Sequence, residues 1–249
     1  SFSIQYIGLN VNEPPLDDIN VRKALNLAID KNEIATIVLG DQVVPATGIL
    51  PPGFPGFNPS ISGYEFDPEK AKQLLLESKY GDNLDDMPPI TITTPGSFGA
   101  NVSLDMEVIL AMWEKNLGIK TEFQQTEFAT FLKDLNKRRF QMFDIGWIAD
   151  YPDPENFLDI LFYSDSSNNH TNYRSPKVDS LLEQARTEGD ETLRFSIYSE
   201  VEQTILDDAP WIPLWYSGER YLLVKPNVHD YLQTPLIIPK LRHVYLTDK

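Results

Sequence analysis

The sequence has no cysteine and only three histidines in 249 residues. A disulfide framework, a thiolate metal site and a cysteine nucleophile are therefore excluded. The histidines stand at positions 170, 229 and 243, too far apart for a local metal motif. We expect neither a metal site nor a bound cofactor.

Positive charge and long apolar runs are also scarce. Lys and Arg number 21 against 37 Asp and Glu, which gives a net charge of −16. Nucleic acids and anionic membranes require a basic protein face, so neither is expected as a partner. No run approaches the roughly 18 apolar residues of a membrane span. Because the chain lacks both an initiator Met and a signal-peptide pattern, we expect a fragment of a longer precursor.

Common enzyme motifs are missing from the sequence. It contains no Gly-rich phosphate loop, no Gly-x-Ser-x-Gly elbow and no His-Glu-x-x-His. The acidic residues Asp150, Asp153 and Glu155 leave one alternative open, a hydrolase that uses a pair of carboxylates. We favour the interpretation that Asp153 and Glu155 cap the following helix and that the protein is not an enzyme.

The hydrophobic pattern indicates an α/β protein. Hydrophobic residues make up 41% of the chain, enough for one large core or for a core and part of a second. Strands are predicted at 4–9, 90–94, 119–125, 142–148, 211–216 and 220–224. Helices are predicted at 18–29, 30–39, between 67 and 81, and at 102–117, 127–138, 157–162, 176–186 and 191–206. The alternation of strands and helices between 90 and 148 predicts right-handed crossovers and a largely parallel sheet.

Two stretches have no regular pattern. Prolines and glycines between 45 and 66 predict a long ordered loop or a strap that crosses between domains. The tail from 226 to 249 has little core of its own, so we expect it to lie against another part of the protein.

The segment from Asp144 to Phe157 carries a strand into an acidic, aromatic and proline-rich loop. Asp150 follows the strand, at the end where open α/β sheets bind ligands. A carboxylate among aromatic rings favours a cation, because a buried unpaired charge costs roughly 3–5 kcal/mol. The simplest small-molecule cation is a primary ammonium. Trp147 is either a pocket residue or a core residue.

Two further pairs of aromatic residues are candidates for the lining of a ligand pocket. Phe128 and Phe131 follow helical spacing, which is more often a core pattern. Trp215 and Tyr216 point to opposite faces of their strand, so one of them is expected to face a ligand.

Several motifs are spaced along almost the whole chain. They are Tyr6-Ile-Gly-Leu-Asn10 with Pro14-Pro15, the helix 18–30, Gly146-Trp147-x-Ala149-Asp150-Tyr151, residues 164–169, Tyr173-x-Ser175-Pro176 and Leu223-Val-Lys-Pro226. In this order they resemble the C-terminal lobe of the peptide-binding proteins of bacterial ABC importers, family 5 of the extracellular solute-binding proteins. This group includes oligopeptide, dipeptide and nickel binders.

The resemblance implies a fold and a function. Residues 1–217 would form a periplasmic-binding-protein-like lobe of type II, cluster C, with a mixed, mostly parallel sheet flanked by helices. Residues 218–249 would return to a missing N-terminal lobe, since whole relatives are about twice this length. The expected protein is a monomeric, extracytoplasmic receptor that captures a peptide and delivers it to a membrane permease, with a signal or lipid anchor upstream.

The resemblance also implies the site residues. Asp150 would take the α-ammonium of the peptide. The aromatic side chains expected around the ligand are Trp147, Phe128, Trp215, Tyr216 and Tyr6. Two positions depart from the family pattern: Asp144 stands where oligopeptide binders can have an arginine, and Gly8 replaces a larger side chain. An oligosaccharide or another solute is therefore kept as an alternative ligand, and a sensor without a transport role as an alternative function.

Overall fold

The computed structural model describes residues 1–96, 102–218, 223–231, 236 and 241–247. Its strands are β1 Ser3–Leu9, β2 Val43–Pro45, β3 Ile90–Pro95, β4 Thr121–Thr126, β5 Met142–Ile148, β6 Trp211–Ser217, β7 Val228–His229 and β8 Tyr245–Leu246. Its α-helices are α1 Ile19–Leu27, α2 Lys31–Glu33, α3 Pro68–Leu76, α4 Leu104–Leu117, α5 Phe128–Leu135, α6 Glu155–Phe162, α7 Pro176–Thr187 and α8 Glu191–Asp208. A π-helical turn, Ile34–Val38, continues α2, and 3-10 turns occupy Leu84–Asp86 and Leu241–His243.

Helix starts follow the capping residues read from the sequence. The side chains of Asp18, Asp30, Asp67 and Asp190 each accept a hydrogen bond from a backbone N–H in the first turn of the helix that follows. Such a bond satisfies one of the N–H groups that have no partner within the helix. Gly118 ends α4 with a φ of 70°, a conformation that glycine adopts without a steric cost.

A six-stranded mixed sheet runs through the molecule in the order β2-β6-β1-β5-β3-β4. The pairs β3–β4 and β3–β5 are parallel, because α4 and α5 return the chain to the same end of the sheet between strands. The pairs β1–β5, β1–β6 and β2–β6 are antiparallel. The parallel part thus coincides with the strand-helix alternation predicted between 90 and 148, and the other strands make the sheet mixed.

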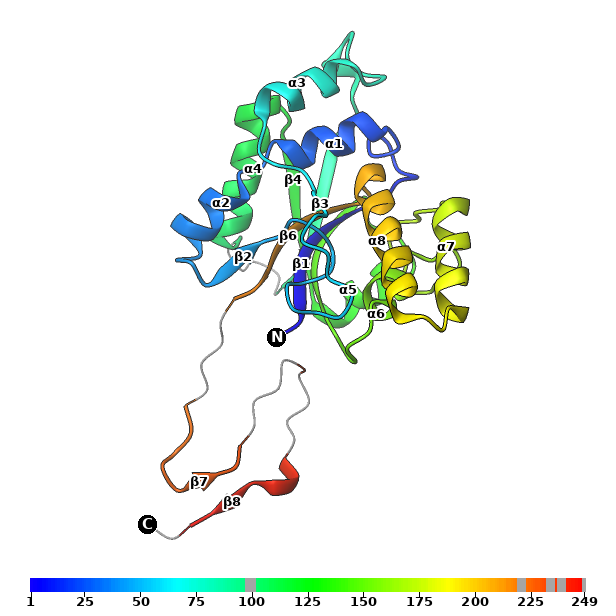
Figure 1. The fold of residues 1–249 in the computed structure, drawn as a ribbon. Coiled ribbons are helices and arrows are strands. Elements are labelled where there is room, and N and C mark those ends of the chain that lie inside the picture. Colours follow the sequence, from blue (N-terminus) through cyan, green and yellow to red (C-terminus); the bar gives the residue numbers. More distant parts are fainter. Residues whose placement is uncertain (97–101, 219–222, 232–235, 237–240, 248–249) are drawn as a thin grey trace.

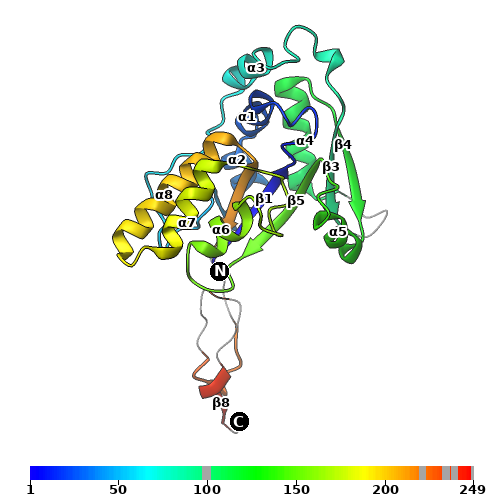
Figure 2. The ribbon, with the colours of Figure 1, turned by 90° about the vertical axis from the view of Figure 1, so that its right-hand side faces the viewer.

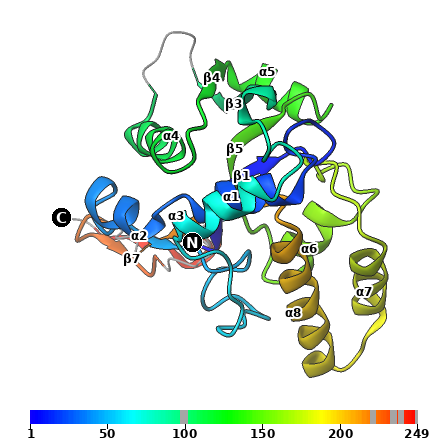
Figure 3. The same ribbon diagram turned by 90° about the horizontal axis from the view of Figure 1, so that it is seen from above.

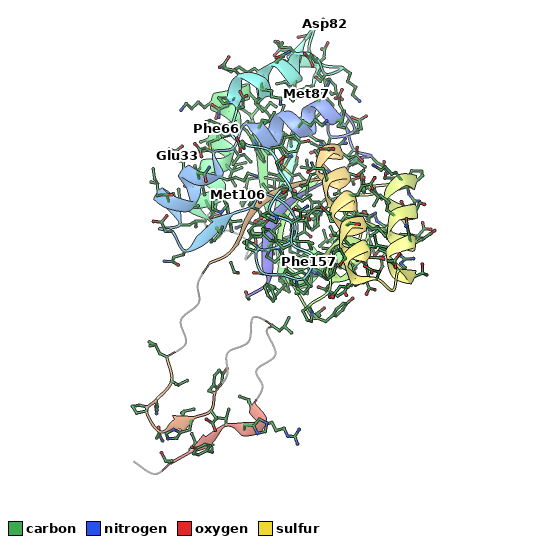
Figure 4. The ribbon with its side chains drawn as sticks, in the orientation of Figure 1. Glu33, Phe66, Asp82, Met87, Met106 and Phe157 are labelled. Atoms are coloured by element: carbon green, nitrogen blue, oxygen red, sulfur yellow. The ribbon has the colours of Figure 1, made fainter. Side chains whose placement is uncertain are left out.

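Helices cover both faces of this sheet, with a hydrophobic core under each (Figure 1). One core joins odd-numbered residues of β1 to α1, α3 and α4, and the other joins even-numbered residues of β1 to α5, α6, α7 and α8. Viewed from above, α4 and the α7–α8 pair lie on opposite sides of β1 and β5 (Figure 3). Figure 4 labels one residue of each core. Met106 of α4 belongs to the core under α1, α3 and α4, and Phe157 of α6 belongs to the core under α5 to α8.

The proline-rich stretch 46–66 is an ordered loop that packs on the body of the molecule. Glu202 of α8 accepts hydrogen bonds from the backbone N–H groups of Ile49 (2.6 Å) and Leu50 (2.9 Å). The hydroxyl of Tyr216 donates to the carbonyl of Gly48 at 2.8 Å. The loop therefore obtains from β6 and α8 the backbone partners that it lacks internally.

The tail departs from the expected strand at 220–224. Residues 220–222 lie outside the described part, and Leu223 and Val224 are not in a strand. Leu223 is 96% exposed, so the described residues provide neither the burial nor a neighbouring strand at this position. Beyond it, β7 and β8 pair with each other and lie away from the body (Figure 2). Leu236 is the described tail residue that packs against a core, the one under α5 to α8.

Candidate functional site

One end of the sheet collects the ends of four long strands. The strands β3, β4 and β5 run in the same direction, and β6 joins them because both β5 and β6 are antiparallel to β1. The start of β1 therefore lies at this end too, close to the point where β6 leaves the body (Figure 1). Three large hydrophobic side chains are exposed at or just beyond these strand ends: Phe128, Ile148 and Tyr151.

Asp150 lies at this end of the sheet, two residues after β5. Its side chain is exposed, and its carboxylate has no hydrogen bond or ion pair with the residues that the structure describes. The backbone just before it is anchored, because the N–H of the buried Ala149 donates to the carbonyl of Phe2 at 2.9 Å. Asp150 is thus a free carboxylate on a fixed backbone.

Asn156 holds Trp147 and Asp150 together. The side-chain oxygen of Asn156 accepts hydrogen bonds from the indole N–H of Trp147 at 3.1 Å and from the backbone N–H of Asp150 at 3.4 Å. Asn156 itself is fully buried in the first turn of α6. Trp147 is partly buried and packs against the core on the α6 side. The core interpretation of Trp147 therefore holds in part. Its role as a pocket residue stays a prediction, although Asn156 links it to the backbone of Asp150.

Sequence reasoning missed Asn156. The available signal was an asparagine directly before the apolar residues Phe157 and Leu158, where a buried amide is unfavourable unless it has a tertiary partner.

Asp153, another carboxylate of this loop, has structural partners. Asp153 forms a two-point ion pair with Arg194 of α8, with N–O distances of 2.7 and 2.8 Å. It also accepts a hydrogen bond from the N–H of Glu155, the first residue of α6, at 3.0 Å. The N-cap of α6 is Pro154, which makes no side-chain cap, so the cap position is not occupied by Asp153 or Glu155 as expected. Burial acts to raise the pKa of Asp153, but the hydrogen bonds from Arg194 and Glu155 outweigh it and leave the pKa below its usual value. Arg194 therefore stabilises the ionised form of Asp153. A carboxylate that is already paired with an arginine is poorly suited to act as the acid or the nucleophile of a hydrolase, so this contact argues against the paired-carboxylate alternative.

Phe128 and Asp144 line a pocket of about 440 Å³ at the same end of the sheet. Phe128 begins α5 and is 56% exposed, so it is not a core residue. Asp144 is partly buried on β5, where the side-chain N–H of Gln5 donates to it at 2.7 Å. Burial, with a smaller contribution from Asp105, raises the pKa of Asp144 to about 7, although the hydrogen bond from Gln5 acts to lower it.

The remaining predicted aromatic residues are buried. Tyr6 is 2% exposed and stacks on Trp211 at 3.3 Å between ring centroids. Tyr216 is also 2% exposed and lies in the same core. Trp215 lies in the core on the opposite face, so the two rings do point to opposite sides of β6. A ligand contact for Tyr6, Trp215 or Tyr216 stays a prediction, because the described structure places each ring in a core.

The departure at Gly8 has a packing explanation. A Cβ atom at this position would lie 2.1 Å from the ring of Phe143, which pairs with Gly8 across β1 and β5. Only glycine leaves room for that ring.

A larger hollow of about 720 Å³ lies between the 46–66 loop and the start of α2, away from Asp150 and Asp144. Within the described ranges, no group of three or more His, Asp or Glu side chains is arranged to hold a metal ion. The helices among these residues include none that is long and apolar enough to cross a bilayer.

Known proteins resemble this chain over nearly its whole length. The oligopeptide-binding protein OppA of Bacillus subtilis is 28% identical over 250 residues, which cover 98% of this chain and 44% of that protein. Heme-binding protein A of Haemophilus influenzae is 32% identical over 239 residues, 94% of this chain and 42% of that protein. The solved structure of the ABC transporter-associated periplasmic binding protein DppA from Helicobacter pylori, in complex with peptide STSA, matches with a TM-score of 0.84 and 26% identity. That match covers 99% of this chain and 47% of the DppA chain.

The chain thus spans less than half the length of each of these three proteins. Residues 1–169 match the family described as bacterial extracellular solute-binding proteins, family 5 middle. This match covers more than half of the chain, and it includes β1 to β5 and the loop that carries Asp150. The expected periplasmic-binding-protein-like fold is confirmed as well. The chain belongs to the bacterial extracellular solute-binding proteins of family 5.

Proposed function

We propose that this chain is the C-terminal lobe of an extracytoplasmic receptor that captures a peptide and delivers it to the permease of an ABC importer. In this proposal Asp150 pairs with the α-ammonium group of the peptide, and Trp147 forms a wall of the same subsite. The protein acts by binding and release, without catalysis.

The observation that carries the proposal is the free carboxylate of Asp150. Other carboxylates of the body, such as Asp153 and Glu202, have partners within the chain, whereas Asp150 has none among the described residues. Its backbone is fixed by Asn156, and the neighbouring indole is fixed by the same amide. A preorganised anion beside an aromatic ring suits a primary ammonium, which gains both the charge pairing and contact with the ring face.

The names of the similar proteins support a peptide as the ligand. The relative from Bacillus subtilis is called an oligopeptide-binding protein, and the similar structure from Helicobacter pylori contains a peptide. The exposed rings of Phe128 and Tyr151 and the exposed Ile148 surround the strand ends. We propose that the part of the relatives missing from this chain covers these side chains when a peptide is bound, since closure of a second lobe removes water from the ligand.

The test uses the whole two-lobed protein and isothermal titration calorimetry. Asp150→Asn keeps the shape of the side chain and removes its charge, so peptide affinity is expected to fall at least about tenfold, the usual scale for a lost charge-assisted hydrogen bond. An N-acetylated version of the same peptide has no α-ammonium. Its affinity is expected to be low for both proteins and nearly unaffected by the substitution.

Two results would contradict the proposal. An equal loss of affinity for the free and the acetylated peptide would show that Asp150 does not pair with the ammonium. Binding of haem or of an oligosaccharide, with no binding of any peptide, would show that the ligand class is wrong. Glu155→Gln is the matched control, because it removes a nearby negative charge at the start of α6 without changing Asp150 or Asn156.

A further inference from the structure

Asp144 is the second carboxylate at the ligand end of the sheet, and it lies in a pocket of its own. The pocket is formed where several elements end: Thr94 from the end of β3, Gln125 from the end of β4, Ser103 just before α4 and Phe128 at the start of α5. Asp150 does not line it. The pocket is therefore separate from the proposed ammonium subsite, although both open at the same end of the sheet.

Asp144 is unlike the carboxylates that have structural roles in this chain. Asp159 is held at two points by Arg186, at 2.7 and 2.8 Å, and Asp153 is held in the same way by Arg194. Asp144 receives one hydrogen bond, from Gln5 to its Oδ1 atom. Its Oδ2 atom has no partner among the described residues. One donor leaves a carboxylate far short of its capacity of about four hydrogen bonds.

The backbone is shaped so that Gln5 can reach Asp144. Gln5 pairs with Gly146 across β1 and β5. A Cβ atom at position 146 would lie 2.8 Å from the side-chain oxygen of Gln5, so the glycine leaves space for that amide. Gln5 then donates its N–H to Oδ1 of Asp144, which leaves Oδ2 without a described partner.

The described residues of the pocket offer no positive charge to this carboxylate. The described residues that line it include neither Lys nor Arg. The nearby charge that acts on Asp144 is Asp105, which is also negative. A partly buried anion with one neutral hydrogen-bond donor and no described cationic partner is costly, and a cation that enters the pocket would remove that cost.

The rest of the lining limits the kind of cation. Thr94, Ser103 and Gln125 are neutral, and Phe128 offers an exposed ring. A metal ion needs more charged ligands than one carboxylate, whereas a long side chain with an apolar stem and a cationic head fits a ring at the rim and a carboxylate deeper inside.

We propose that the Asp144 pocket binds the side chain of a lysine or arginine in the peptide ligand, with the ammonium or guanidinium on Oδ2 of Asp144 and the aliphatic stem against Phe128. This inference rests on the proposed peptide-binding function and adds a side-chain preference to it. Asp150 recognises the terminus that every peptide has, and Asp144 selects among peptides.

The experiment uses the whole protein and calorimetry with two matched sets of tetrapeptides. Each peptide is built from alanine and carries, at one position in turn, either lysine or norleucine, which has a similar stem without the charge. At one position lysine is expected to bind at least about tenfold more tightly than norleucine, the scale of a charge-assisted hydrogen bond. Asp144→Asn, whose Oδ1 can still accept from Gln5, is expected to bring that ratio close to one.

The same titrations separate this inference from the function on which it rests. Asp150→Asn is expected to weaken all the peptides and to preserve the lysine-to-norleucine ratio. A ratio near one at every position in the wild-type protein would overturn the cation pocket while peptide binding stands, and this result does not depend on the folding of any variant. A ratio that persists in Asp144→Asn would also overturn it. Failure of every peptide to bind would overturn the proposed function and this inference together.

Discussion

At the scale of single residues, the carboxylates divide by the partners that they find. Glu202 is 2% exposed, and one of its oxygens accepts hydrogen bonds from two backbone N–H groups of the 46–66 loop. Burial raises its pKa to about 7, although those two bonds act to lower it. Glu202 is thus used for structure, whereas Asp150 and Asp144 keep oxygens free for a ligand.

Glu202 is expected to make the free energy of unfolding depend on pH. Because the pKa of Glu202 is raised in the folded protein, its contribution to stability is complete below the unfolded value near 4.5 and is lost as the pH rises through about 7. The whole loss is at most about 3 kcal/mol, from about 1.4 kcal/mol per pKa unit. Glu202→Gln is expected to flatten the dependence of the free energy of unfolding on pH between pH 5 and pH 8, as measured by urea unfolding.

The comparison with the wild type isolates Glu202, because Asp144 titrates in the same direction in both proteins. Glu200→Gln on the same helix is the control, since Glu200 is exposed and pairs with the exposed Lys177. An identical pH dependence in the wild type and in Glu202→Gln would show that the buried carboxylate does not titrate in this range.

At the scale of elements, one ion pair connects the ligand loop to α8. Arg194 of α8 contacts Asp153 at two points, and it also donates to the backbone carbonyl of Ala185 at the end of α7. Its side chain is 21% exposed and that of Asp153 is 31% exposed. This pair fixes the start of α6, and α6 carries the Asn156 that positions Trp147 and Asp150.

The prediction at this scale is that Arg194→Met destabilises the protein. It leaves Asp153 partly buried without its cation, so the free energy of unfolding is expected to fall by about 1–3 kcal/mol, the cost of an unsatisfied polar group. Urea unfolding measures the change. Lys177→Met is the control, because its pair with Glu200 is exposed at the surface and such pairs contribute about 0–1 kcal/mol. Equal losses in the two variants would mean that Arg194 does not brace the loop.

At the scale of the whole molecule, the chain has one large α/β body and a tail with few contacts to it. Both cores are made almost entirely by residues up to position 216, and Leu236 is the described tail residue that packs against one of them. Residues 223–231 and 241–247 lie away from the body (Figures 1 and 2). The division into a lobe of residues 1–217 and a return segment of residues 218–249 remains a prediction.

That division predicts the stability of a shortened chain. Residues 1–217 alone are expected to unfold cooperatively. Their free energy of unfolding is expected to lie within about 1 kcal/mol of that of the 249-residue chain, because the described tail contributes one partly buried side chain, Leu236, to the cores. Phe157→Ala in the full 249-residue chain is the reference for real core damage, with an expected loss of about 3–5 kcal/mol for a fully buried phenylalanine. A loss of that size on shortening would place the tail in the core of this lobe.

Most helices and the long strands of the body could be predicted from local sequence, whereas the short strands β2, β7 and β8 could not. Capping residues such as Asp67 and Asp190 lie next to the helices that they start, and alternating apolar residues mark the strands, so short-range chemistry suffices for both. The spaced motifs also revealed the family and pointed to Asp150. The expected strand at 220–224 was wrong at Leu223 and Val224, because strand formation needs a neighbouring strand that local sequence does not reveal.

Which side chains are available to bind a ligand depends on tertiary contacts. Gln5 and Asp144 are 139 residues apart in sequence, and Asp153 and Arg194 are 41 apart. The contact with Gln5 leaves one oxygen of Asp144 without a described partner, whereas Arg194 binds both oxygens of Asp153. Tyr6, Trp215 and Tyr216 lie in the cores, and a ligand contact for them stays a prediction. Helical spacing alone favoured a core position for Phe128, whereas the family resemblance placed it near the ligand, and its side chain is exposed in a pocket. Residue type sets what a group can do, whereas its availability depends on long-range partners that the packing of sheet and helices brings together.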